Sequence, residues 1–384
     1  MANDLRSIMP TILAQGLKVL RENTPMAQLV TRSFDQAAMQ KGDVVNVPIA
    51  APMGEAMDVV PSANPTASAD ISPRSVPIKL DRWKEQSFYL TDKDMGEIVR
   101  GFQNLQIQEA ARSIARTIER DLFRLYQFSP YVVGTPGVTP FAQESGATPY
   151  PDHMGLGAMR AVRRILSKNL ADTNNRYIVL DPDAEANAAT LAQFTSASDA
   201  GTDLTIKQGM IGRKFGFDWY MSQNMLTHTR GVAGTVTTDG STNVLNSPTL
   251  AITGATAAPN AGDVFTIAGD PLPYSALTGS TATVVQVSPA LRRVFASGAV
   301  VTIVTSATPA VQNLVFHRDA FALAVRTMNG VDGLGNELST FTDDVSGLPM
   351  RLEISRQNKQ TKFSFDVLYG VAALRPELAV RLNG

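Results

Sequence analysis

GDVVNVPIAAPMGEAMDVVPSANPTASADISPRSVPIKLDRW, residues 42–83, is the most informative stretch of this chain. Its prolines at positions 48, 52, 61, 65, 73 and 77 each lack a backbone donor and fix φ, which excludes a helix and disfavours a central strand. Both ends nevertheless alternate apolar and polar residues, over Val44–Ile49 and Val76–Leu80, as strands do. We therefore expect residues 42–90 to form a protruding two-stranded ribbon without a core of its own. Because such a hairpin is marginally stable alone in water, a partner should complete it.

The composition excludes several classes of protein. The chain has 384 residues, enough for two or three cores, and a net charge of −1, which argues against a strongly basic nucleic-acid binder but not against a local basic patch. It has no cysteine, so no disulfide, thiolate metal site or cysteine nucleophile is expected. No apolar run approaches the roughly 20 residues that span a bilayer, and the N-terminus lacks the order of a secretory signal. The segment Leu5–Leu20 instead predicts a short amphipathic helix.

The strongest helical pattern follows the ribbon. Over Phe102–Phe128 an apolar stripe recurs at helical spacing, and Pro130 ends it. Thr91 and Asp94 form a weak capping signal before this helix. The stripe consists of Ala110, Ile114, Ile118, Leu122 and Leu125.

Helices and strands alternate beyond this helix, as in an α+β fold. A Gly/Pro/Thr-rich loop over 131–151 leads to a helix at about 153–170, capped by Asp152. Arg176–Leu180 predicts a buried strand, and Pro182 opens another helix. Nearer the C-terminus, His317–Met328 predicts a helix. Met350–Ser355 and Lys362–Tyr369 alternate as strands.

Residues 226–312 differ in composition from the rest. They are rich in Thr, Gly, Ala and Val and almost uncharged, with short strand-like runs at 249–253, 263–268, 281–287 and 299–305 between turn signals. This spacing predicts a small sandwich or barrel. Because helical and strand patterns resume afterwards, the β-rich stretch looks like a domain inserted into an α+β region.

No motif for catalysis, cofactor binding or metal binding stands out. The three histidines, His153, His228 and His317, are far apart in the sequence, so surface positions are expected rather than a metal site. GLGAMR, residues 155–160, lacks the third glycine of a phosphate fingerprint and follows no strand, so we interpret it as the entry to a helix. The prediction is accordingly no catalytic residue, no cofactor and no metal.

Two clusters are candidate subunit-interface residues. The ribbon carries Arg74, Lys79, Arg82 and Trp83. Trp83 either anchors a partner or docks the ribbon base onto its own domain, and the sequence favours neither. The long helix carries Arg112, Arg116, Arg120 and Arg124 at a spacing of four, where like charges repel by a few tenths of a kcal/mol per pair. Carboxylates of the same chain and solvent, or a partner surface or polyanion, would compensate.

The order of these elements resembles the major capsid proteins of tailed double-stranded-DNA bacteriophages, with the Hong Kong 97 capsid fold. More narrowly, it is similar to podovirus-type coat proteins with an inserted β-barrel. The residues that carry this resemblance are TPMAQLV (24–30), GDVFTIAG (262–269), TVVQV (283–287), FHRDAFALAVRTM (316–328) and LYGVAALRPELAV (368–380). None of these segments is a catalytic motif, and the resemblance rests on their order.

The resemblance implies a role for each segment. Residues 1–41 would be an N-terminal arm, 42–90 an extended loop over a neighbouring subunit, and 91–170 the spine helix with most of a peripheral domain. Residues 171–225 and 313–348 would form an axial domain, 226–312 an outward-facing inserted barrel, and 349–384 a return to the core sheet. Only about forty residues precede the extended loop, so a separate scaffolding protein is expected.

The implied function is a major capsid protein that assembles with itself into hexamers and pentamers of an icosahedral shell. Its implied partners are the scaffolding protein, a portal protein, DNA packaged without sequence-specific binding and, optionally, a decoration protein, with no membrane. Its implied location is the virion capsid, assembled in the host bacterial cytoplasm. The alternative is a β-rich ligand- or carbohydrate-binding protein, or an enzyme with an unrecognised active site, which would need a convergent polar pocket.

Overall fold

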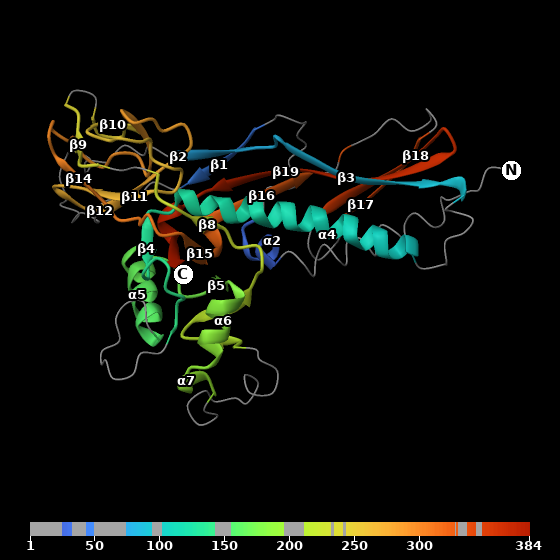
Figure 1. The fold of residues 1–384 in the computed structure, drawn as a ribbon, viewed down its shortest axis with the longest axis horizontal. Helices are drawn as coiled ribbons and strands as arrows, with labels where there is room; N and C mark the ends of the chain where they lie inside the picture. The colour runs from blue at the N-terminus through green and yellow to red at the C-terminus, as the bar shows by residue number, and fades with distance from the viewer. Residues whose placement is uncertain are drawn as a thin grey trace, which may run out of the picture.

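A long helix lies along an extended sheet, and a closed barrel stands beside the C-terminal end of that helix (Figure 1). In this computed structural model the described residues are 25–32, 44–49, 74–93, 102–142, 155–195, 211–231, 234–240, 243–326, 328, 336–342 and 348–384. The predicted N-terminal amphipathic helix, the ribbon segment 50–73, the capping residues Asp94 and Asp152, and His153 lie outside them.

The extended half of the molecule consists of a sheet covered on one face by helix α4 (Phe102–Phe123). The strand order is β16-β19-β18-β17, with β3 pairing the other side of β19. The strands are β3 (Arg82–Thr91), β16 (Phe321–Arg326), β17 (Asn336–Thr342), β18 (Pro349–Gln357) and β19 (Gln360–Ala373). The stripe residues Ile114, Ile118 and Leu122 of α4 are buried in one core with Phe363 and Phe365 of β19. The predicted long helix is confirmed, and its last turn is the 3-10 helix η1 (Arg124–Phe128).

The base of the predicted ribbon is present as strands β1 (Val44–Ile49) and β2 (Arg74–Lys79), paired antiparallel from Val44↔Lys79 to Ile49↔Arg74. The expectation that it lacks a core is wrong for this base. Val45, Val47 and Ile78 are buried against Ala322 and Ala324 of β16. The alternation in the two strands therefore reflects one face packed on the chain's own sheet.

A second sheet forms the lower part of the molecule in Figure 1, together with helices α5 (Gly155–Lys168), α6 (Pro182–Ala189) and α7 (Ala192–Thr195). Its order is β4-β20-β15-β5-β7-β6, and β8 also pairs with β15. The strands are β4 (Tyr131–Val133), β5 (Arg176–Leu180), β6 (Arg213–Lys214), β7 (Phe217–Met221), β8 (Thr227–His228), β15 (Ala310–His317) and β20 (Ala379–Asn383). The predicted strand at 176–180 and the helix that Pro182 opens are confirmed.

The β-rich stretch forms a closed six-stranded barrel in the order β10-β13-β12-β11-β14-β9. Its strands are β9 (Val236–Thr238), β10 (Thr249–Thr253), β11 (Val264–Ile267), β12 (Asp270–Ala276), β13 (Val284–Ser288) and β14 (Val300–Ile303). A separate core fills it, with Leu250, Phe265, Tyr274 and Leu291 buried. The two strands that flank it in the sequence, β8 and β15, pair with each other in the second sheet.

The predicted helix over His317–Met328 is wrong. A short 3-10 turn, η2 (Arg318–Ala320), leads directly into β16. Phe321 to Val325 are all buried, so both faces of this strand are covered. A strand that is apolar on both faces cannot be distinguished from a buried helix by periodicity alone. Residues 313–348 are thereby divided between the two sheets, since β15 belongs to one and β16 and β17 to the other.

The remaining short elements join these parts. Helix α2 (Pro25–Leu29) buries Met26 and Leu29 and is followed by a bridge from Thr31 to Ala322. The 3-10 helix η3 (Pro376–Leu378) connects β19 to β20. None of the helices in the described ranges is long and apolar enough to cross a membrane.

Candidate functional site

The arginine stripe of α4 is not uniform. Arg112 is paired with Glu109 one turn earlier, and Arg124 Nη1 lies 2.8 Å from Asp121 Oδ1. Arg116 and Arg120 are exposed, and neither forms an ion pair with a residue that the structure describes. Carboxylates of the same helix thus compensate the two ends of the stripe, while its middle faces outward.

Arg82 of the ribbon cluster is used within the subunit. Its Nη1 lies 2.7 Å from Asp121 Oδ2, which also accepts a hydrogen bond of 2.8 Å from the Tyr369 hydroxyl. Burial and the neighbouring carboxylate raise the pKa of Tyr369, so the hydroxyl keeps its proton as a donor. Asp121 therefore links α4 to β3 and β19.

Trp83 is both docked and exposed. Its Nε1 donates to Asp366 Oδ2 at 2.8 Å, while 44% of the residue remains accessible. Asp366 also accepts from Arg351 Nε at 2.8 Å, and the Arg351 guanidinium lies 5.9 Å from the centre of the indole ring. Of the other two ribbon residues, Lys79 is exposed at the end of β2, and Arg74 is described only as the first residue of that strand.

Part of the sheet face that carries Trp83, along β3, β18 and residues 360–366 of β19, is polar, which the sequence analysis did not anticipate. Strand pairing places Trp83 and Glu85 of β3 beside Leu368 and Asp366 of β19. Lys362 Nζ donates to Glu85 Oε1 at 2.7 Å, and this hydrogen bond lowers the pKa of Glu85. The alternation of charged residues along β18 and β19 is the signal that could have identified this face, because the opposite face packs on α4.

A buried arginine holds the barrel against the second sheet. Arg381 of β20 is fully buried, and its Nη1 donates to the Gly262 carbonyl at 2.6 Å while its Nη2 donates to Ser275 Oγ at 2.8 Å. The guanidinium also lies 5.1 Å from the centre of the Tyr126 ring. Desolvation lowers the pKa of Arg381 to about 10, so it stays charged at neutral pH.

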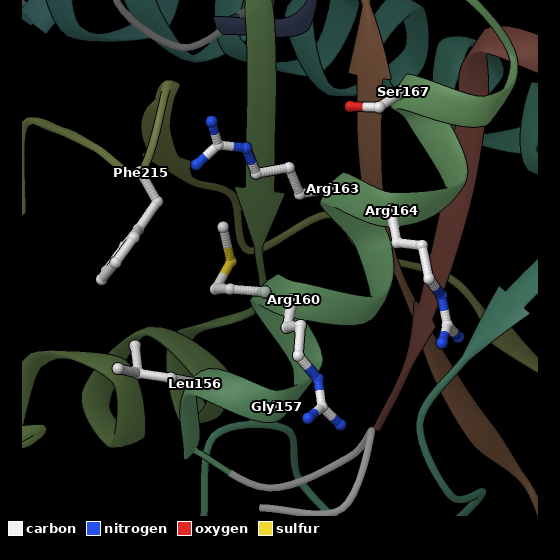
Figure 2. A pocket seen from close by; sticks show the side chains of 8 residues that line it. Leu156, Gly157, Arg160, Arg163, Arg164, Ser167 and Phe215 are labelled. Atoms are coloured by element: carbon white, nitrogen blue, oxygen red, sulfur yellow. The ribbon is translucent and has the colours of Figure 1, made fainter. Parts of the chain in front are cut away.

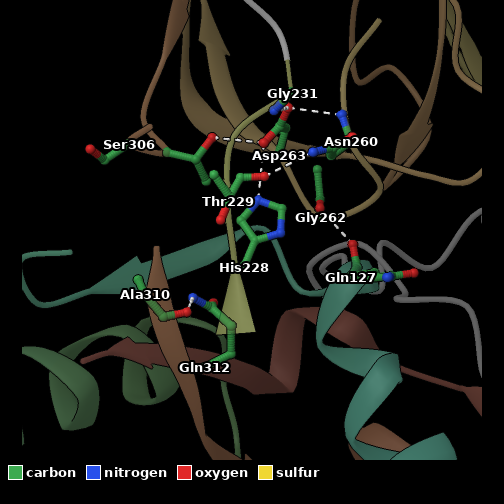
Figure 3. Close-up of polar contacts among 12 residues, drawn as sticks. Gln127, His228, Thr229, Gly231, Asn260, Gly262, Asp263, Ser306, Ala310 and Gln312 are labelled. Atoms are coloured by element: carbon green, nitrogen blue, oxygen red, sulfur yellow. Dashed lines mark hydrogen bonds and ion pairs between the residues drawn. The ribbon is translucent and has the colours of Figure 1, made fainter. Parts of the chain in front are cut away.

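A second chain of polar contacts runs beside it. The Tyr126 hydroxyl is 3.1 Å from His228 Nδ1. His228 Nε2 is 3.0 Å from Asp263 Oδ1, as Figure 3 shows. The tautomer with hydrogen on Nε2 satisfies both contacts, since the hydroxyl then donates to Nδ1 and Nε2 donates to the carboxylate. All three side chains are buried, so this chain of contacts stabilises the junction and presents no reactive group to solvent.

The Asp263 carboxylate accepts hydrogen bonds from two side chains and two backbone N–H groups. Its Oδ1 accepts from His228 and from Thr305 Oγ1 at 3.2 Å, and its Oδ2 accepts from the backbone N–H groups of Gly231 and Asn260, each at 3.0 Å. We define the junction network as Tyr126, His228, Asp263, Ser275 and Arg381. It joins the end of α4, the barrel and β20 into one unit.

The prediction that the histidines lie on the surface is wrong for the two that the structure describes. His228 is buried in the junction network, and His317 is buried where Nδ1 accepts from the Asp319 N–H at 3.3 Å. Both sit where strands leave one layer for another, a position that the spacing in the sequence does not reveal. Among the described residues no group of His, Asp or Glu has the arrangement of a metal site.

The comparison with protein families and the comparison with solved structures both find phage capsid proteins. The family described as "Phage capsid protein" matches residues 73–270, just over half of the chain. No curated protein sequence matches.

Solved structures are similar over nearly the whole chain. The capsid structure of the cyanophage P-SCSP1u has a TM-score of 0.53 and 12% identity, over 94% of this chain and 87% of that one. A structure from Mycobacterium phage Che8 has a TM-score of 0.50 and 14% identity, over 94% and 91%. The mature capsid of bacteriophage PhiM1 has a TM-score of 0.50 and 9% identity, over 94% and 86%. At such low identities these are likenesses of fold.

Proposed function

This chain belongs to the phage capsid protein family, and from that membership we propose that it is the major subunit of an icosahedral shell enclosing double-stranded DNA. Copies of the chain would assemble into the hexamers and pentamers of that shell. The observation that carries the proposal is the family match, which spans β2, α4 and half of the barrel, on a fold shared with capsid structures. The finer assignment to the Hong Kong 97 capsid fold with an inserted barrel is part of this proposal.

The distribution of polar groups supports a structural role. One face of the extended sheet packs on α4, while the opposite face is covered by β1 and β2 over β16 and is polar along β3, β18 and residues 360–366 of β19. Arg116 and Arg120 face outward from the helix. Long, flat, charged surfaces suit contacts with neighbouring copies and with packaged DNA.

Each segment of the chain would form a particular domain of the shell subunit. The extended sheet with α4 would be the peripheral domain, the second sheet with α5 to α7 the axial domain, and the barrel an outward-facing insertion between β8 and β15. Residues 1–41 would act as the N-terminal arm. Since β1 and β2 are anchored on their own subunit, residues 50–73 would be the part of the ribbon that contacts a neighbour.

The proposed shell function implies several partners. A separate scaffolding protein would guide assembly in the host cytoplasm, a portal protein would occupy one vertex, and DNA would be enclosed without sequence-specific binding. A decoration protein would be an optional addition to the mature virion. The subunit itself would have no enzymatic activity.

Overexpression followed by sedimentation and negative-stain electron microscopy tests this function. Wild-type protein, alone or with a scaffolding protein, should form shells, sheets or tubes. A variant that lacks residues 52–72 should remain a folded, soluble monomer. A wild-type chain that stays monomeric under all assembly conditions would contradict the proposal, and normal shells from the deletion variant would contradict the role given to the ribbon.

A further inference from the structure

A groove of about 520 Å³ lies between α5 and the turn that joins β6 to β7 (Figure 2). Leu156 and Met159 of α5 and Phe215 of the turn form its apolar lining. Arg163 points across the groove from α5 toward Phe215. The groove is therefore shaped for an apolar side chain with an anionic group nearby.

Phe215 occupies a position that its side chain does not favour. Phe215 and Gly216 have φ of 53° and 83°, the pattern of a type I′ hairpin turn. Asn-Gly and Asp-Gly are preferred there, and a bulky side chain at positive φ is strained. The ring packs against Phe194 at 5.8 Å between centres, yet 42% of the residue is exposed. Strain at an exposed apolar residue points to a role outside the folding of the monomer.

All the charged residues of α5 are basic. The helix carries Arg160, Arg163, Arg164 and Lys168 and no acidic residue. Arg163 is exposed, and the pKa of Arg176 is lowered mainly by burial and further by the positive charge of Arg163. The groove therefore has a positive potential that favours an anion.

A protruding apolar residue, Leu170, follows the C-terminal end of α5, close in sequence to Ser167 of the groove lining. Leu170 is 91% exposed and has a φ of 56°. It follows the helix at the position where the Ala171 N–H bonds to the Leu166 carbonyl at 3.0 Å, a C-cap that favours glycine. Two residues on, the exposed Asp172 carboxylate accepts from the Asn174 N–H at 3.2 Å, and backbone hydrogen bonds lower its pKa. A strained, exposed leucine and an ionised carboxylate thus flank Ala171 in the sequence.

We propose that the groove receives Leu170 and Asp172 of a second copy of this chain. Leu170 would pack against the apolar lining that Phe215 completes, and Asp172 would pair with Arg163. In a ring of identical subunits, the groove of each copy would receive Leu170 and Asp172 of the next copy, which is a heterologous contact. This contact rests on the proposed shell function and specifies one of the surfaces through which copies associate.

A charge swap in the full-length chain tests the pairing. Arg163→Asp and Asp172→Arg should each reduce particle yield at least about tenfold, because a like-charge pair replaces an attractive one at the interface. The double variant should recover most of that loss. Assembly of either single variant at wild-type yield would overturn the proposal, and so would a double variant that assembles no better than the singles.

Two further variants separate folding from assembly. Leu170→Gly and Phe215→Asn replace strained residues with those preferred at their φ, so the melting temperature of the monomer should be unchanged or raised while particle yield falls. Lys359→Gly is the matched control, since Lys359 is exposed at a φ of 60° in the turn between β18 and β19, and it should assemble as wild type. Normal particle yields from both Leu170→Gly and Phe215→Asn would overturn the proposed contact but not the shell function. Wild-type protein that forms no particle would overturn the shell function and the contact with it.

Discussion

Both carboxylate oxygens of Asp263 accept hydrogen bonds from side-chain and backbone donors, and the substitution Asp263→Asn tests how much these bonds stabilise the fold. In Asp263→Asn, either orientation of the amide would place its NH₂ group against donors, His228 and Thr305 on one side or two backbone N–H groups on the other. Because buried donors left without an acceptor are costly, we expect the variant to lose about 2–4 kcal/mol of unfolding free energy. Urea denaturation of the monomer measures this. A loss below about 1 kcal/mol would mean that the network adapts and does not fix the barrel.

Glu119 of α4 predicts a pH dependence. It is buried, its Oε1 accepts from Ser222 Oγ at 3.1 Å, its Oε2 accepts from Asn224 Nδ2 at 2.6 Å, and desolvation raises its pKa above the ordinary 4.5. The folded state then binds this proton more tightly than the unfolded state. Stability is therefore lost as pH rises from 4.5 through the raised pKa and stays constant above it.

Glu119→Gln keeps the shape of the side chain and removes this titration. The melting temperature of the variant minus that of wild type should increase with pH above 4.5 and then level off. Calorimetry on the monomer at a series of pH values measures the difference. A difference that is the same at every pH would show that burial does not shift this carboxyl.

Single residues show where the sequence was informative and where it was not. The alternation of Val45 and Val47 correctly predicted a strand, because a half-buried strand needs that pattern. Nothing in the sequence revealed that Arg381 and His228 meet in one buried network, because they lie far apart in the chain and only the fold brings them together. The positive φ of Leu170 and Phe215 could not be predicted either. Leucine and phenylalanine rarely adopt positive φ, so their presence in the sequence gives no sign of it.

At the scale of elements, Gly370 of β19 sets the position of the ribbon base. A Cβ at this residue would lie 2.2 Å from the Lys79 carbonyl oxygen, so only glycine allows β2 to approach β19 this closely. Gly370→Ala should therefore displace the end of β2, at a cost of about 1–3 kcal/mol as in other overpacked sites. Hydrogen exchange of the β2 amides should accelerate more than that of the barrel amides. Unchanged exchange in β2 would show that the ribbon base does not depend on this contact.

Arg116 and Arg120, in the middle of the α4 arginine stripe, form no ion pair with the residues that the structure describes. Arg116→Glu with Arg120→Glu should leave the melting temperature of the monomer unchanged, because exposed charges contribute under about 1 kcal/mol and the flanking pairs with Arg112 and Arg124 become attractive. Particle yield or DNA retention should fall. For contrast, Arg124→Glu should lower the melting temperature, since it places a carboxylate beside Asp121. Full yields of DNA-filled particles from the double variant would show that the stripe is only a solvated face.

A helix with a single apolar face was easier to predict than a strand that is apolar on both faces. Helix α4 was expected from its single apolar stripe, whereas β16 was mistaken for a helix because both of its faces are apolar. Strand β12 was missed because it contains Pro271 and Pro273. It pairs with β13 only through Ser275 and Ala276, so these prolines remove no hydrogen bond from that pair.

At the scale of the whole molecule, the order of segments carried most of the information about function. The sequence predicted a small sandwich or barrel for the β-rich stretch, and the structure has a closed barrel there. The pairing of β8 with β15 accounts for how the chain leaves the second sheet and returns to it. The division of strands between the two sheets was not predictable, because long-range pairing of β20 with β15 and β4 depends on partners distant in sequence.

The central claim is that many copies of this one chain build a closed icosahedral shell. Cryo-electron microscopy of particles purified after overexpression tests it most directly. We expect a reconstruction with icosahedral symmetry in which this chain occupies both six-membered and five-membered rings, with the barrel on the outer surface. Closed shells without icosahedral symmetry, or a shell whose density fits a different fold, would contradict it.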